Sequence, residues 1–559
     1  MKRTRILPEN KFFQNSVLLY VLLMVSVFPL FCPSKYFHIQ EDHLNFFTVV
    51  TWGLLSLFLI SLVVYYYQVS SQYEGAFGTR IQQEIKKLSI TDYAFFALLI
   101  SCIISTCFSY YPEASFTGEN GRLMGLSTYL LLFITYFLVS RGFKFKNYVI
   151  IVLLITADIM SLIAVLQRSG CDVFGLFKNL SITTQLQYIS TIGNIDFFSS
   201  YVMLTLPISA CLFCFYDNKL NWFYFLSTLM SFAALIVANA DSGFAAAALM
   251  FVMLGIFCFK SLKTLKKFIA VLFAFFASCR LEYFLIRVDG NAFASLKSIP
   301  HALLTSHVTL ICLIITAVLM AAAYYFNYKG CQFEKSLKFL KLAFISLALL
   351  LVAILVFIFI WFSWVDTSKP LGYLGNYLRF NNQWGDNRGY IFSLAIGSFI
   401  KFNPFQKLFG YGMDMFKIVI MNLLNFKPSQ LSQFQIYDSA HNELLNQLIS
   451  TGLVGCASYI VFIISQIVKN IKKSKKEPLL LVFAVCFSCY FIQSLANIAI
   501  PMVFPLLILL IAVSESINRE MALKAALDAT ALTEKNAREK AQQVQKTKKA
   551  KNSPAKTHR

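Results

Sequence analysis

The chain has 559 residues, of which 58% are hydrophobic and only 14% charged. Soluble globular proteins have about 25% charged residues, so the composition argues against a soluble enzyme, a disordered protein and a nucleic-acid-binding module. The net charge of +22 would suggest nucleic acid in a soluble protein. Here Lys and Arg stand in short clusters between apolar runs, as the positive-inside rule expects of membrane proteins. We therefore expect a lipid bilayer, and no nucleic acid, as a partner.

Fourteen apolar segments are long enough, or nearly so, to cross a bilayer as a helix, which takes about 20 residues. Backbone groups in lipid must form their hydrogen bonds within the segment, which favours helices. The alternation of apolar and polar residues that is typical of the strands of a membrane barrel is absent. The expected spans are 14–32, 45–67, 92–108, 123–140, 148–166, 197–216, 222–239, 244–259, 268–286, 305–326, 342–364, 452–468, 478–495 and 499–514. The sequence thus predicts an all-α polytopic membrane protein with about 12–14 transmembrane helices.

Basic residues assign an orientation to these spans. With the N-terminus in the cytoplasm, every strong basic cluster falls on the cytoplasmic side. These clusters lie at 86–87, 141–146, 260–267, 329–341 and 472–476. We expect a multi-pass protein of the cell membrane (inner or plasma membrane), with both termini in the cytoplasm and a first span that is not cleaved as a signal peptide.

This layout predicts four regions. They are an N-terminal transmembrane bundle (1–364), a large extracytoplasmic loop (365–451), C-terminal transmembrane helices (452–514) and a basic cytoplasmic tail (515–559), helical to about 545 and then disordered. Loops of this length in compact proteins are usually functional or disordered, and the many aromatic residues of this one argue against disorder. We expect it to fold over the outer face of the bundle, with a helix over 390–400 that ends at Asn403-Pro404.

The run from Tyr437 to Gly455 holds the strongest candidate for chemistry. Asp438 or Ser439 is a suitable N-cap, which predicts His441 in the first turn of a helix, where the helix dipole favours a neutral imidazole. A neutral imidazole at the outer membrane face can act as a general base, and Asp438 could reach its other ring nitrogen and fix its tautomer. A histidine that merely caps the helix or packs against it is the alternative.

Two arginines, Arg379 and Arg388, precede this run in the long loop. A guanidinium suits phosphate oxygens because it presents a planar fork of donors and stays charged, so the pair is a candidate site for a pyrophosphate. The equal alternative is that they contact lipid headgroups or pair with Asp386. Gly410-Tyr411-Gly412 allows a tight turn or a close approach to a ligand.

Other polar segments are expected at the same membrane face. They are 118–125, which includes Arg122, 193–196 and 239–243, and they either line a cavity under the loop or form ordinary turns. Asp158 falls inside an expected span, where a charge is costly, and is either functional or bonded to a neighbouring helix. The thirteen Cys lie mostly in or beside apolar runs and are expected to pack. We predict no metal site and no cofactor.

Several of these motifs together resemble the bacterial O-antigen ligase and polymerase superfamily. The likeness covers about residues 90–514. Its most specific part is His441-Asn442-x-x-Leu445-x-x-Leu448 followed by Gly452-x-x-Gly455, where the large loop enters the next membrane helix. Looser likenesses are Arg388 with the helix after it, Asn403-Pro404, Leu408 to Gly412, Gln167-Arg168-x-x-Cys171-Asp172 with Gly193-Asn194, and Gly121-Arg122-x-x-Gly125.

The resemblance implies a glycosyltransferase that takes a glycan from an undecaprenyl-diphosphate carrier, without a metal. The acceptor hydroxyl would belong to a second glycan, a lipid or a protein. His441 is then the catalytic base, and Arg388 is the catalytic residue that stabilises the leaving diphosphate. The resemblance makes Arg379, Arg122 and Asn442 the expected substrate-binding residues.

Two other classes of function fit parts of the chain. A transporter or lipid-linked oligosaccharide flippase suits the number of spans, with Asp158, Arg280 and Glu282 marking a path, although no internal repeat is evident. A structural membrane protein whose loop binds a cell-wall partner needs neither the histidine nor the arginines. Replacing His441 or Asp158 distinguishes these hypotheses from the enzyme.

Overall fold

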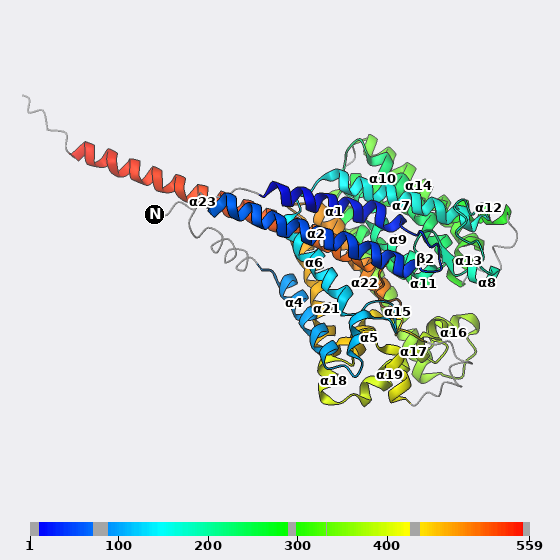
Figure 1. Cartoon of the computed structure of the whole chain (residues 1–559). Coiled ribbons are helices and arrows are strands. Elements are labelled where there is room, and N and C mark those ends of the chain that lie inside the picture. The colour runs from blue at the N-terminus through cyan, green and yellow to red at the C-terminus, as the bar shows by residue number, and fades with distance from the viewer. Residues whose placement is uncertain (1–9, 71–87, 289–297, 331–332, 425–436, 552–559) are drawn as a thin grey trace, which may run out of the picture.

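The computed structural model describes residues 10–70, 88–288, 298–330, 333–424 and 437–551. Helices make up most of this part of the chain (Figure 1), and the strands described are β1 (Tyr188–Ile189) and β2 (Gly193–Asn194), which pair antiparallel. The helices are α1 Lys11–Leu30, α2 Ile39–Ser70, α4 Ile90–Cys107, α5 Pro112–Thr117, α6 Leu126–Gly142, α7 Asn147–Arg168, α8 Ile182–Gln185, α9 Ile195–Phe215, α10 Asn221–Ala238, α11 Asp241–Cys258, α12 Leu262–Val288, α13 Ser298–Thr305, α14 His307–Tyr328, α15 Glu334–Ile360 with a π-helical end Trp361–Val365, a 3-10 turn Gly372–Leu374, α16 Gly375–Leu378, α17 Trp384–Lys401, α18 Pro404–Phe409, α19 Phe416–Leu423, α21 Glu443–Lys473, α22 Leu479–Ser494 and α23 Phe504–Lys551.

The helices have the lengths and composition of membrane spans. Within the described residues, eleven are long and apolar enough to cross a bilayer, namely α1, α2, α4, α7, α9, α10, α11, α12, α14, α15 and α21. Two shorter apolar helices, α6 and α22, and the apolar start of α23 coincide with the three remaining expected spans. The prediction of an all-α polytopic membrane protein is therefore confirmed.

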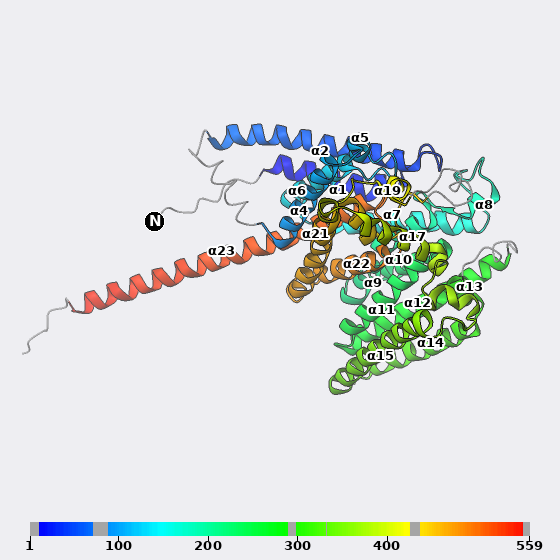
Figure 2. The same ribbon diagram turned by 90° about the horizontal axis from the view of Figure 1, so that it is seen from below.

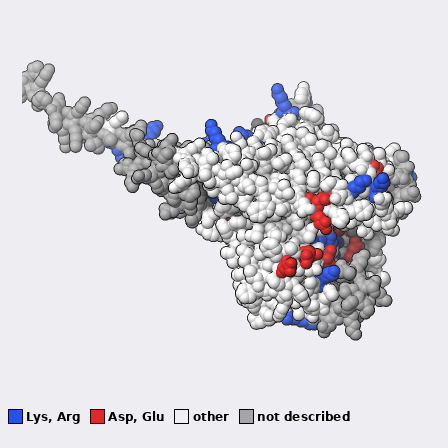
Figure 3. Space-filling view, in the orientation of Figure 1, with Lys and Arg blue, Asp and Glu red and all other residues white. Residues whose placement is uncertain are grey.

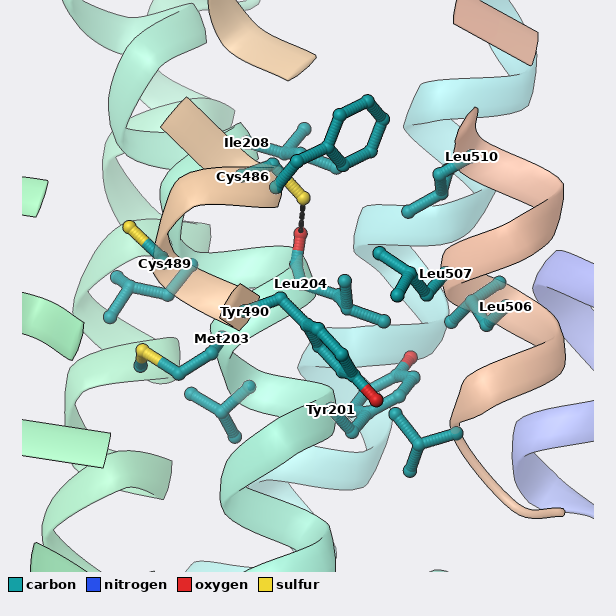
Figure 4. Packing of buried hydrophobic residues seen from close by; sticks show 14 of the residues in the cluster. Tyr201, Met203, Leu204, Ile208, Cys486, Cys489, Tyr490, Leu506, Leu507 and Leu510 are labelled. Atoms are coloured by element: carbon teal, nitrogen blue, oxygen red, sulfur yellow. Dashed lines mark hydrogen bonds between the residues drawn. The ribbon is translucent and has the colours of Figure 1, made fainter. Parts of the chain in front are cut away.

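The centre of the bundle is α9, whose apolar 18-residue stretch is entirely buried inside the protein. It packs against α10, α11 and α22. Figure 4 shows this packing, with the Sγ of Cys486 in α22 donating to the carbonyl of Leu204 in α9 at 3.2 Å and leucines of α23 nearby. Cys486 and Cys489 are fully buried here, which is the packing role expected of cysteines in apolar runs.

A cluster of ion pairs joins α4, α6 and α23 at one end of the bundle. Asp92 is fully buried, and its carboxylate lies 2.9 Å from Arg141 Nη2 and 3.8 Å from Arg519 Nη1. Beyond this cluster α23 runs out of the body as a long helix (Figures 1 and 2). The helix continues to Lys551, past its predicted end near 545, because Ala, Gln and Lys are good helix formers. The basic residues at 86–87 and the tail after 551 lie outside the described residues.

The long loop folds into a lobe built from α16, α17, α18 and α19, on one side of the bundle in Figure 1. The lobe has a small apolar core of its own, centred on Ile391, Phe402, Tyr411 and Phe416. The predicted helix over 390–400 is part of α17, and the expected break at Asn403-Pro404 is present: Asn403 caps α18, with Pro404 as its first residue.

The lobe is anchored to α21 by a close contact between two glycines. Gly410 and Gly452 both have positive φ, of 85° and 66°. A Cβ at Gly410 would meet the backbone of Ser450, and one at Gly452 would meet the backbone of Leu408. The tight turn expected at Gly410 thus serves a backbone contact, which only glycine permits, beside a break in α21.

Candidate functional site

His441 lies immediately before α21. The helix begins at Glu443, and its N-cap is Asn442, whose side chain accepts a hydrogen bond from Leu445 N at 3.0 Å. The predicted N-cap at Asp438 or Ser439, with His441 in the first helical turn, is therefore wrong. The reason is that Asp438 is engaged by an arginine, and His441 takes a φ of +47°, which turns the chain before the helix starts.

Asn442 and Glu443 join the start of α21 to the segment after α22. Asn442 Nδ2 donates to the carbonyl of Leu495 at 2.7 Å. Glu443 is buried, and its carboxylate accepts hydrogen bonds from Ala499 N at 2.6 Å and Gln447 Nε2 at 2.8 Å. Both ends of the Asn442 amide are thus bonded to backbone, so in this structure the residue positions its neighbour His441.

Arg388 is presented by an unusual turn at the start of α17. Gly385, Asp386 and Asn387 all have positive φ, between 59° and 70°. The guanidinium then reaches across to the bundle, where Nη2 lies 3.4 Å from Asp196 Oδ2, while Nη1 donates to Gly385 O at 3.1 Å. Its buried Nε has no hydrogen-bond partner among the described residues. The ion pair of Arg388 is thus with Asp196, while Asp386 accepts a hydrogen bond from Asn376.

Asp196 stands in the first turn of α9, directly after the β1–β2 hairpin. Asn194 caps this helix through a hydrogen bond from Asp196 N at 2.9 Å. Two buried amides near the end of α22 donate to the Asp196 carbonyl, Asn497 at 2.9 Å and Gln493 at 3.3 Å. Asp196 belongs to the polar segment 193–196 expected at this face, and its pairing with Arg388 is a feature that the sequence did not predict.

Arg122 comes from the loop before α6. Its Nε lies 2.9 Å from Asp438 Oδ2, and the guanidinium sits 5.4 Å from the ring centre of Phe197. Asp438 is therefore the link between this loop and the segment that carries His441. The ion pair that it forms is with Arg122, and its contact with the second ring nitrogen of His441 stays a prediction.

The backbone around Arg122 is held by Asp414, which the sequence analysis missed. The Asp414 carboxylate accepts hydrogen bonds from Arg122 N at 2.6 Å and Met124 N at 3.0 Å. Gly121 packs directly on this carboxylate, where a Cβ would collide. Asp414 is almost fully buried, and this desolvation raises its pKa to about 6. The one feature of the sequence that could have indicated this role is the position of Asp414, two residues after the Gly410-Tyr411-Gly412 turn.

Four charges from four segments act on His441. Desolvation is the largest influence and lowers the pKa of the imidazole to about 4; the positive charges of Arg388 and Arg122 act in the same direction, while Asp438 and Asp196 oppose them. The ring is therefore neutral at physiological pH. Figure 3 shows acidic and basic side chains side by side where the lobe meets the bundle.

Arg379 has a different environment. Its guanidinium donates to the backbone carbonyls of Phe362 at 3.0 Å, Asp366 at 3.2 Å and Lys369 at 2.7 Å. It thus closes the π-helical end of α15. The structure brings Arg122 and Arg388 to His441, whereas the donors of Arg379 are directed at main-chain oxygens.

The charged residues inside the spans mostly have structural partners. Ser227 Oγ of α10 donates to Asp158 of α7 at 2.8 Å, which is the helix-to-helix bond that was the alternative to a functional role. Arg280 donates to backbone carbonyls at Leu304 and Ser306. Glu282 is buried, with one oxygen that has no hydrogen-bond partner among the described residues.

The described residues include no group of three or more His, Cys, Asp or Glu side chains able to hold a metal ion. In comparisons with known proteins, no family model and no curated protein matches the chain. What the site offers chemically is one neutral imidazole, on which the charges of two guanidinium groups act, and each guanidinium is paired with one carboxylate.

Proposed function

We propose that the protein is a membrane glycosyltransferase. It moves a glycan from an undecaprenyl-diphosphate-linked donor to a hydroxyl of a glycan, lipid or protein acceptor, at the extracytoplasmic face of the cell membrane, with both termini in the cytoplasm. The observation that carries this proposal is the convergence of Arg122, Arg388 and His441, which are far apart in sequence, beside the ends of membrane helices.

The chemistry fits these groups. His441 accepts the proton of the acceptor hydroxyl as its oxygen attacks the anomeric carbon. The bond from that carbon to the diphosphate oxygen breaks, and its electron pair leaves with the diphosphate. Arg388 and Arg122 stabilise the growing negative charge, which is the role that preorganised cations fill best. Attack opposite the leaving group inverts the anomeric centre.

Two of the expected substrate-binding residues have a smaller part in this proposal. Arg379 and Asn442 both direct their hydrogen bonds at backbone groups. Arg379 stabilises the end of α15 next to the lobe, and Asn442 sets the position of His441. Replacing Arg379 or Asn442 by Ala tests whether either side chain also contributes to binding of the donor or the acceptor.

The experiment is a set of single replacements in the native host. His441→Ala and Arg388→Ala should abolish the surface polysaccharide and cause the lipid-linked precursor to accumulate at an unchanged protein level. His301→Ala is the matched control, because His301 is exposed on α13, away from these contacts. Normal polymer with His441→Ala at a normal protein level would contradict the proposal. Precursor trapped on the cytoplasmic leaflet would favour the flippase.

A further inference from the structure

Both arginines of the candidate site are already paired with carboxylates. Arg122 lies against Asp438, and Arg388 lies against Asp196. The side chains of the first pair are 21% and 29% exposed, and those of the second are 14% and 21% exposed. These pairs are therefore mostly shielded from water, with a fraction of each side chain still exposed.

A diphosphate competes directly with these carboxylates. It carries more negative charge than one carboxylate and offers several oxygens to the fork of a guanidinium. A bound diphosphate would thus draw Arg122 away from Asp438. The unpartnered Nε of the neighbouring Arg388 is a further donor for phosphate oxygens.

Asp438 has a second group within its electrostatic reach. It lies three residues before His441, and its negative charge acts on the imidazole. The other charges that act on this ring are Arg388 from α17, Arg122 from the loop before α6 and Asp196 from α9. The two polar side chains that contact Asp196 from the other side, Gln493 in α22 and Asn497 just after it, are neutral amides. Asp438 is the only one of these groups on the same segment as His441, so it can follow the ring without movement of a helix.

We infer that Asp438 changes partner during the reaction: it holds Arg122 while no donor is bound, and it turns to the His441 ring when the donor diphosphate takes Arg122. This inference rests on the proposed function, because it requires a diphosphate ligand. It adds a positioning residue, Asp438, whose exchange makes His441 a stronger base only after the donor has bound.

The exchange solves a chemical difficulty of the donor-free site. A base is most effective when its pKa is near the working pH, whereas desolvation and two nearby guanidinium groups hold the pKa of His441 near 4. Neutralising the guanidinium charges with a diphosphate, and bringing a carboxylate to the ring, both favour the protonated imidazole. The proton taken from the acceptor hydroxyl then has a stable place on His441.

The test is a titration of His441 in the full chain in lipid nanodiscs, with isotope-labelled histidine. The chain has six histidines, and a His441→Gln sample identifies the signal of this one. Undecaprenyl diphosphate is the probe. We expect the pKa of His441 to rise by about one with the probe bound, a tenfold gain in proton affinity, and to rise clearly less in Asp438→Asn. Glu113→Gln is the control, because it removes an exposed carboxylate on α5 and should behave as wild type.

Two results would overturn the inference and leave the proposed function intact: a bound probe that leaves the pKa of His441 unchanged, and an Asp438→Asn protein that responds as wild type does. A probe that does not bind at all overturns the proposed function as well. Arg122→Gln provides a second test if Asp438→Asn folds poorly. It releases Asp438 permanently, so the pKa of His441 should be raised without probe, and an unchanged pKa there also overturns the inference.

Discussion

Arg388 Nη2 lies 3.4 Å from Asp196 Oδ2, so a residue of the lobe is paired with one in the first turn of the central helix α9, 192 positions away in sequence. This contact is one of several that join the lobe to the bundle. It also places the guanidinium beside His441, since both charges of the pair act on the imidazole.

Breaking this pair should affect both stability and activity. Removing one partner of a shielded charge pair costs about 2–5 kcal/mol, because the other charge remains without compensation. Since both side chains keep some exposure to water, we expect Asp196→Ala to fall near the lower end of that range and to reduce transfer at least tenfold. A double-mutant cycle with Arg388→Ala checks this: additive losses of unfolding free energy would mean that the two side chains do not interact.

The pH dependence should report the lowered pKa of His441. An ordinary histidine becomes protonated as the pH falls through about 6.5, but His441 remains neutral until the pH approaches 4. The value of kcat/KM, which reflects the free enzyme, should therefore hold from pH 7 to about 5 and fall only below that. Initial rates at low donor concentration test this, with the folded fraction followed at each pH. A loss of kcat/KM centred near 6.5 in folded protein would contradict it.

Gly121→Ala should disturb Arg122 without touching its side chain. The added Cβ collides with the buried Asp414 carboxylate, and such overpacking costs about 1–3 kcal/mol. Displacement of the loop should also weaken the Arg122–Asp438 pair and lower activity. Gly397→Ala is the matched control: it lies in α17 with open space around the added Cβ, and should be neutral or slightly stabilising. Equal thermal unfolding of the two variants would disprove the proposed clash.

The ion-pair cluster around Asp92 should matter for stability and not for chemistry. Asp92→Ala removes the buried carboxylate that pairs with Arg141 and Arg519, and breaking a buried pair in this way costs about 3–5 kcal/mol. Asp217→Ala is the control: it removes a carboxylate from an exposed ion pair, with Lys263, and should change the free energy of unfolding little. Urea or thermal unfolding in detergent compares the two. An Asp92→Ala protein as stable as wild type would mean that this cluster does not tie α23 to the bundle.

The hydropathy of the chain predicted the membrane spans, including 268–286, which lies in α12 although it contains Arg280 and Glu282. It succeeded because the bilayer acts on each segment separately, and a long apolar run in lipid must be helical. The local signals at Asn403-Pro404 and Gly410 succeeded for a similar reason, since capping and tight turns depend on adjacent residues.

The surroundings of the candidate site were beyond such local rules. Sequence spacing favoured Asp438 as a cap or as a partner of His441, and Asp386 as a possible partner of Arg388. The observed pairs are Asp438 with Arg122 and Asp196 with Arg388. Which charges meet depends on how the lobe, the loop before α6 and the start of α9 come together, and a charge in a shielded place pairs with whatever opposite charge the packing brings to it.

The amino-acid sequence by itself determined the helical membrane architecture and the residues that could do chemistry, because each depends on side chains and their immediate neighbours. Only the tertiary structure decided which of them act on one another: Arg122 and Arg388 beside His441, and Arg379 on main-chain oxygens. The physical reason is that ion pairing and desolvation are properties of the assembled bundle and lobe, in which segments up to hundreds of residues apart share one small volume of low dielectric.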